Sequence, residues 1–141
     1  MAIPLRKPNE IEKLRIANIA VAKTLNFLKV NVKAGMTLKE VDAMGEKFLR
    51  DLGARPSFKG LYGFPAAICT SLNEVIIHGI PTDVVLKEGD ILGIDIGSEI
   101  DGWYGDSAIT MPIGKISKED EALIACAKDS LYYAIDVIKE G

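Results

Sequence analysis

The 141-residue chain is long enough to bury a hydrophobic core and corresponds in length to a single domain. Hydrophobic residues make up 48% and charged residues 26%, and the net charge of −3 without a basic patch argues against a nucleic-acid partner. There is no signal-peptide pattern, no apolar run of about eighteen residues and no closely spaced cysteine pair, so we expect a cytoplasmic protein without a membrane partner.

Two helices are predicted in the first third of the chain. Asn9, followed by Glu12, forms a capping-box pattern, and the helical repeat of apolar residues behind it continues until Gly35 ends the region. A second capping box at residues 37–40 begins a shorter helix, which Gly53 ends in a left-handed conformation. The predicted apolar positions are Ile11, Leu14, Ile16, Ile19, Val21, Ala22, Leu25 and Leu28 in the first helix, and Leu38, Val41, Met44 and Phe48 in the second.

The middle of the chain has the character of strands and loops. Residues 54–80 mix aromatic, β-branched and glycine residues, as short strands do, and residues 90–96 read as a buried strand. Asp101-Gly102 is a strong hairpin signal that joins this strand to another at residues 103–111. A final helix is predicted after Ser117. The order of elements indicates an α+β fold, in which helices cover one face of a mostly antiparallel sheet.

Two carboxylates occupy unusual positions in this predicted hairpin. Asp95 interrupts an apolar strand, where an unpaired ionised carboxylate is costly, and it shares its face with Gly93 and Gly97, which leave space above it. If residues 101–102 are the central turn residues, Gly97 pairs with Asp106, and the two aspartates are diagonal neighbours with Cβ atoms roughly 7–8 Å apart. Carboxylates so placed can hold two cations about 3.5–4 Å apart. A one-residue shift of register would instead put them on opposite faces.

A structural role for the two aspartates is the alternative. Both could accept hydrogen bonds from backbone N–H groups or pair with a lysine or arginine, and the residues alone leave the two interpretations about equally favoured. Hard oxygen ligands would suit divalent Mn, Fe, Co or Zn. His78, the only histidine, follows an apolar segment predicted to be a strand and precedes a turn. It is either a structural residue or a proton donor or substrate contact.

Several separated motifs resemble the type I methionine aminopeptidases. They are the run from Gly63 to Pro81, which contains His78, the strand from Gly89 to Ile96, and the hairpin segment from Asp101 to Asp106. The similarity covers essentially the whole chain, with the motifs in the family's order. It implies half of a "pita-bread" fold, in which residues 1–141 form a single domain that corresponds to the amino-terminal half of the catalytic domain.

The resemblance also implies roles for individual residues. The aspartate at position 95 would bind one of two divalent metal ions, Asp106 would bridge both ions, and His78 would contact the substrate near the scissile amide. The activity would be removal of the initiator methionine from nascent proteins or peptides in which a small residue follows it. The residues that would line the methionine side-chain pocket are Phe64, Cys69 and Leu61.

In that family the second half of the fold supplies the remaining metal ligands, including a histidine, and none of these lies in the present sequence. We therefore expect incomplete or absent metal binding by this chain alone, and a partner that is the missing carboxy-terminal half or a second copy of the chain. Two alternatives remain: a non-catalytic half-fold that forms a symmetric dimer, and a related Xaa-Pro peptidase.

Overall fold

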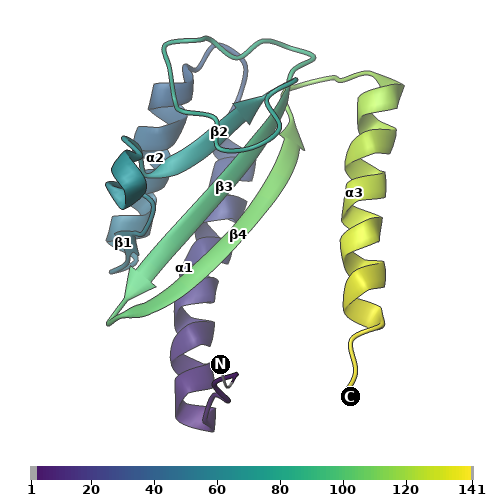
Figure 1. Ribbon diagram of the computed structural model, residues 1–141. Coiled ribbons are helices and arrows are strands. Elements are labelled where there is room, and N and C mark those ends of the chain that lie inside the picture. The colour runs from purple at the N-terminus through teal and green to yellow at the C-terminus, as the bar shows by residue number, and fades with distance from the viewer. Residues whose placement is uncertain (1–2, 141) are drawn as a thin grey trace.

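The computed structural model describes residues 3–140 (Figure 1). Within these residues the chain forms three α-helices, one short 3₁₀ helix and a four-stranded antiparallel sheet. In chain order the elements are α1 (Pro8–Asn31), α2 (Leu38–Asp51), β1 (Arg55–Pro56), η1 (Leu61–Gly63), β2 (Ile68–Leu72), β3 (Ile91–Ile100), β4 (Trp103–Pro112) and α3 (Lys118–Asp136). The α+β prediction is confirmed.

Helix α1 begins earlier than the sequence pattern suggested. Lys7, not Asn9, is the N-cap residue: its backbone N–H donates to Glu10 Oε2 at 2.7 Å, and Pro8 occupies the first helical position, where no N–H is needed. The helix packs in part through small residues, which a pattern of large apolar side chains does not identify. Its buried positions are Ala17, Ala20, Val21, Thr24, Leu25 and Leu28, whereas Ile11, Ile16, Ile19 and Ala22 of the predicted set are exposed.

Helix α2 agrees with its predicted ends. The Thr37 hydroxyl accepts from the N–H of Glu40, whose carboxylate accepts in turn from the N–H of Thr37. Gly53 follows the helix with a φ of +78°, the left-handed conformation that glycine adopts without strain. Phe48 stacks on Phe27 of α1 with ring centroids 4.1 Å apart, which joins the two helices.

Strand β3 is the centre of the sheet. Strand β4 pairs along one edge of β3, and β1 and β2 pair along the other. The hairpin register is the predicted one, with Ile100 opposite Trp103 and Gly97 opposite Asp106. The two turn residues, Asp101 and Gly102, have φ values of +52° and +79°, as a two-residue hairpin turn of this hand requires.

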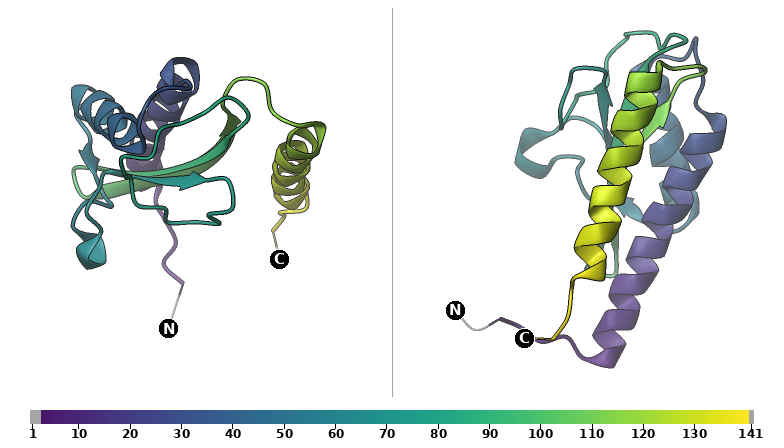
Figure 2. Two further views of the ribbon diagram at one scale, coloured as in Figure 1. Left: turned by 90° about the horizontal axis from the view of Figure 1, so that it is seen from above. Right: turned by 90° about the vertical axis from the view of Figure 1, so that its right-hand side faces the viewer.

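Helices α1 and α2 cover one face of the sheet, and the segment around η1 lies on the other (Figure 2, left). The core between helices and sheet includes Leu28, Leu49, Leu92, Ile94 and Ile96. Helix α3 does not cover the sheet: it stands beside it, after β4, and contains no buried residue (Figures 1 and 2). Within residues 3–140 no helix is long and apolar enough to cross a membrane.

Candidate metal centre and adjoining pocket

The side chains of β3 point alternately to the two faces of the sheet. One face packs against the helices and forms the core, and the other, here called the open face, is not covered by them. Leu92, Ile94 and Ile96 are fully buried beneath the helices, and Asp95 projects to the opposite side, where it is half-buried. Asp106 shares that side, because its cross-strand partner Gly97 lies two residues from Asp95. The two carboxylates are therefore diagonal neighbours on one face, as the hairpin pattern predicted.

The electrostatic environment of the pair favours a cation. Burial raises the pKa of Asp95, and the negative charge of Asp106 and a hydrogen bond between the two carboxyl groups raise it further. The ion pairs formed by the described residues involve neither aspartate, so no lysine or arginine neutralises them. Two acidic groups held together without a counter-charge have the hard-oxygen chemistry that divalent metal ions require.

The pair does not complete a metal site by itself. Among residues 3–140 no group of three or more histidine, cysteine, aspartate or glutamate side chains is arranged to hold a metal ion. Cys69 of β2 lies directly opposite Asp95. Burial raises the pKa of the Cys69 thiol to about 11, and the charges of Asp95 and Asp106 add to this effect, so the sulfur is a neutral thiol in the metal-free chain.

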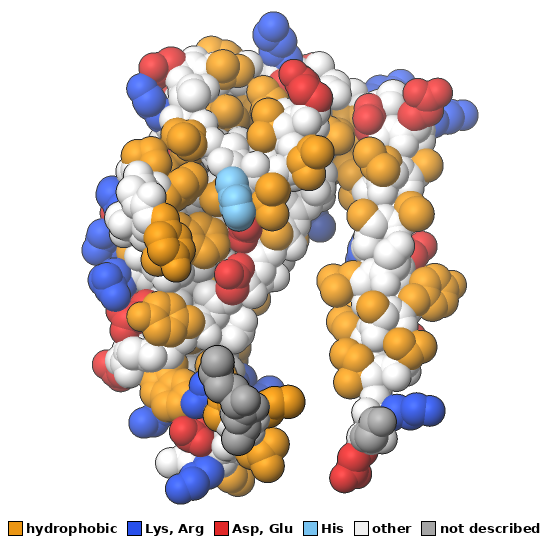
Figure 3. All heavy atoms as spheres, in the orientation of Figure 1, with side chains coloured by type: hydrophobic (Ala, Val, Ile, Leu, Met, Phe, Trp, Pro, Cys, Tyr) orange, Lys and Arg blue, Asp and Glu red, His pale blue; other side chains and the backbone are white. Residues whose placement is uncertain are grey.

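His78 lies on the loop in front of this face and not at the end of a strand. The predicted strand at residues 75–77 is wrong: Val75, Ile76 and Ile77 are exposed, because the chain leaves the sheet after β2. The histidine has a φ of +57°, an uncommon conformation for a residue with a side chain. Figure 3 shows its ring on the open face, among hydrophobic side chains and next to acidic ones.

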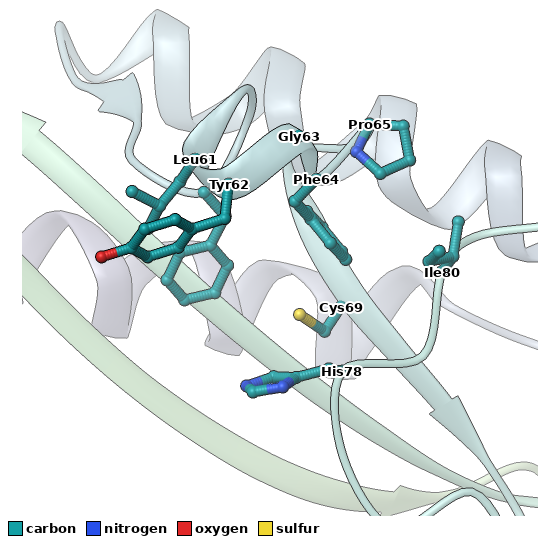
Figure 4. Close-up of a pocket in the computed structure, with 9 residues that line it drawn as sticks. Leu61, Tyr62, Gly63, Phe64, Pro65, Cys69, His78 and Ile80 are labelled. Atoms are coloured by element: carbon teal, nitrogen blue, oxygen red, sulfur yellow. The ribbon is translucent and has the colours of Figure 1, made fainter.

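The backbone after His78 is fixed to the sheet. The N–H of Thr70 donates to the carbonyl of Gly79 at 2.8 Å, and the N–H of Gly79 donates to Ser71 Oγ at 3.2 Å. A Cβ at Gly79 would lie 2.3 Å from the Thr70 carbonyl oxygen, so only glycine permits this approach. The fixed loop holds the imidazole next to Cys69 (Figure 4).

A pocket of about 410 Å³ adjoins the carboxylates. It brings together all four residues predicted to contact a substrate, Leu61, Phe64, Cys69 and His78, although they come from three different segments of the chain (Figure 4). The other lining residues are not predicted as pocket residues by the sequence, in which the only signal for them is the aromatic and glycine content of the segment after β1. These further residues are Phe58, Tyr62, Gly63, Pro65 and Ile80.

Comparison with known proteins gives a consistent result. The model of the metallopeptidase family M24 matches residues 12–141. The methionine aminopeptidase of Helicobacter pylori is 56% identical over 141 residues, which cover all of this chain and 56% of that protein. Methionine aminopeptidase 1 of Bacillus subtilis is 45% identical over 136 residues, which cover 96% of this chain and 55% of the relative.

Solved structures agree. The methionine aminopeptidase of Thermotoga maritima superposes with a TM-score of 0.95 at 35% identity, covering 99% of this chain and 57% of that one. An X-Pro aminopeptidase from the same organism superposes with a TM-score of 0.69 at 26% identity, covering 82% of this chain and 31% of that one. The chain thus spans little more than half the length of the methionine aminopeptidases it matches, and its α+β architecture is that of the pita-bread fold. The chain belongs to the metallopeptidase family M24.

Proposed function

We propose that this chain supplies two metal ligands and the side-chain pocket of a methionine aminopeptidase, an enzyme that removes methionine from protein or peptide amino termini when a small residue follows. The observation that carries the proposal is the pair of carboxylates, Asp95 and Asp106, on an open face without a positively charged partner. The adjoining pocket and the similarity to methionine aminopeptidases support it.

Each residue has a separate task in this proposal. Asp95 and Asp106 would hold two divalent ions of the Mn, Fe, Co or Zn class, which supply Lewis acidity and activate water for peptide hydrolysis. The apolar pocket between Phe64 and Cys69 receives the methionine side chain, and the neutral thiol adds no charge to that pocket. His78 faces the carboxylates from the loop and is placed to donate a hydrogen bond to the peptide.

The proposal also predicts that the isolated chain binds metal weakly. Two carboxylates leave a divalent ion short of the ligands it normally takes, and the related proteins have almost half of their length outside the matched region. We propose that this remaining part, on the same chain or a separate one, supplies the other ligands.

A chimera tests the proposal directly. The 141 residues are followed by the carboxy-terminal part of the H. pylori relative that this chain does not match, and methionine release from Met-Ala-Ser is measured with Mn or Co. Asp95→Asn and Asp106→Asn should each reduce kcat/KM by at least about a hundredfold, since each removes a metal ligand. The matched control is Asp83→Asn, a surface aspartate that pairs only with Lys39. A chimera that binds two metal ions and releases no methionine would refute the proposal.

One observation favours a second function, self-association into a symmetric dimer. Helix α3 exposes Leu123, Leu131, Tyr132 and Tyr133, and apolar surface of this extent is costly in water. Light scattering on the isolated chain distinguishes the two ideas, because a monomer at micromolar concentration is incompatible with a stable dimer.

A further inference from the structure

We propose that Gly97 is a positioning residue for the pocket, because its missing side chain makes the space in which the Phe58 ring lies against the sheet. This inference rests on the proposed peptidase function and adds a residue that determines the fit of the first substrate side chain. Gly97 lies on the open face, two residues from Asp95 and opposite Asp106 in the hairpin. Phe58, in the segment after β1, is a wall of the pocket.

Contact distances show that the space at Gly97 is already filled. A Cβ built on Gly97 would lie 2.5 Å from Phe58 Cε1 and 3.0 Å from Phe58 Cδ1. It would also lie 2.1 Å from Ser57 Oγ. The serine hydroxyl can turn away by changing its rotamer, but an aromatic ring has fewer alternatives and is the decisive contact. Even one methyl group at position 97 therefore has to displace the ring.

The backbone beside the ring limits where Phe58 can move. The N–H of Ser57 donates to the carbonyl of Gly97 at 3.1 Å, which holds this segment against β3. The carbonyl of Phe58 accepts from the N–H of Leu61 at 2.9 Å. On the other side, Lys59 Nζ pairs with Glu46 of α2 at 2.7 Å. With these three attachments in place, a ring displaced from Gly97 turns within the pocket and changes the pocket's shape.

Gly93 provides a matched comparison on the same strand. It lies two residues from Asp95 on the other side and shares the open face. A Cβ there would lie 3.4 Å from the nearest atoms, which belong to Ser71, and this is an ordinary van der Waals distance. A methyl group at Gly93 therefore adds the same bulk at the same sequence distance from the aspartate without disturbing the pocket wall. Any difference between Gly93→Ala and Gly97→Ala then reports the contact with Phe58.

Alanine at position 97 should affect binding of the first substrate side chain and not the chemical step. The displaced ring alters the pocket and leaves both carboxylates on their strands, so the KM for a methionine substrate should change while kcat is largely retained. When a hydrophobic pocket loses contact with about one methylene group of the substrate, kcat/KM falls on the order of tenfold. The metal content should stay the same, because neither ligand moves.

The test uses four variants of the chimera described above: Gly97→Ala, Gly93→Ala, Phe58→Ala and the double variant Gly97→Ala with Phe58→Ala. We expect Gly97→Ala to raise the KM for Met-Ala-Ser about tenfold with kcat within about twofold, and Gly93→Ala to match the wild type. In the Phe58→Ala background, adding Gly97→Ala should change nothing further, because the ring with which the methyl collides is absent. Metal analysis of each variant should show equal occupancy.

The outcomes distinguish this inference from the proposed function. Absence of methionine release by the wild-type chimera refutes the function, whereas a normal KM in Gly97→Ala, or an effect that persists in the Phe58→Ala background, refutes the inference. If Gly97→Ala fails to fold, the double variant decides: recovery of the fold supports the contact, and failure overturns it. A readout independent of activity is the ¹⁹F resonance of fluorophenylalanine at position 58 in the isolated chain, which should shift in Gly97→Ala but not in Gly93→Ala.

Discussion

Substitution of Gly105 by alanine should destabilise the chain, because α1 approaches the sheet closely at this position. Gly105 of β4 lies beneath α1, on the face opposite Asp106. A Cβ at this position would lie 2.6 Å from the carbonyl carbon of Ala17 and 2.7 Å from its oxygen. These are backbone atoms, which cannot turn aside as a side chain can. An ordinary contact of 3.4 Å thus requires α1 to move by about 0.8 Å relative to the strand.

The magnitude follows from what this movement disturbs. Overpacking of this kind costs about 1–3 kcal/mol. The cross-strand partner Ser98 donates its hydroxyl to the carbonyl of Ala17 at 2.9 Å, and loss of that buried hydrogen bond costs about 1 kcal/mol more. Alanine also lowers the conformational entropy of the unfolded chain, which offsets about 0.4–1 kcal/mol of this loss of stability. We therefore expect a net decrease of about 1–4 kcal/mol in the free energy of unfolding.

Urea unfolding of the isolated chain, followed by far-ultraviolet circular dichroism, measures this change. Gly93→Ala is the control, because its added methyl group meets nothing closer than 3.4 Å and it should change the free energy of unfolding by less than about 1 kcal/mol. A decrease below about 1 kcal/mol for Gly105→Ala, or an equal decrease in both variants, would show that the close approach does not determine stability.

Three further predictions concern carboxyl and thiol groups. Burial raises the pKa of Asp95, and the charge of Asp106 raises it further. As the pH rises, the Asp95 carboxyl group therefore keeps its proton longer in the folded metal-free chain than in the unfolded chain, where its pKa has the ordinary value of 3.8. The free energy of unfolding should therefore fall as the pH rises from that value through the raised pKa, and Asp95→Asn should remove this fall in denaturation curves measured with a chelator present. Burial raises the pKa of the Cys69 thiol to about 11, so iodoacetamide at about pH 8 should modify the exposed Cys126 first. Mass spectrometry of the intact chain and its peptides measures the two rates of modification, and equal rates would contradict the burial of Cys69. Asp42→Ala should lower the free energy of unfolding by about 1–3 kcal/mol, because the carboxylate accepts from two N–H groups at the start of β2 at 2.9 Å, and an unchanged urea midpoint would refute this.

The hairpin shows what the sequence could predict about the site. The dipeptide Asp101-Gly102 specifies a two-residue turn, the turn determines the register, and the register places Asp95 and Asp106 on one face. Each of these steps is local, so each can be derived from neighbouring residues alone. The outcome could have differed only if a bulge had shifted the strands by one residue.

The pocket and the start of α1 depend on information that is not local. Phe58 became a pocket residue because the segment after β1 folds back over Gly97, a contact between positions 39 residues apart in the sequence. The strand predicted before His78 failed because the loop there has no partner strand, and apolar composition alone does not provide one. Helix α1 begins at Pro8, with Lys7 as its N-cap residue, because Pro8 and Glu10 act together, and this combination competes with the Asn9 pattern.

The isolation of α3 has a consequence for how the molecule unfolds. A helix of 19 residues without a buried side chain depends on its own backbone hydrogen bonds and on the cap at Ser117, and it lacks the tertiary packing that provides most of the stability of helices in proteins. Opening of α3 therefore requires much less free energy than opening of the hairpin, whose amides exchange with deuterium only when the core is exposed. We therefore expect α1, α2 and the sheet to unfold as one cooperative unit and α3 to unfold separately, so that limited proteolysis would remove α3 first.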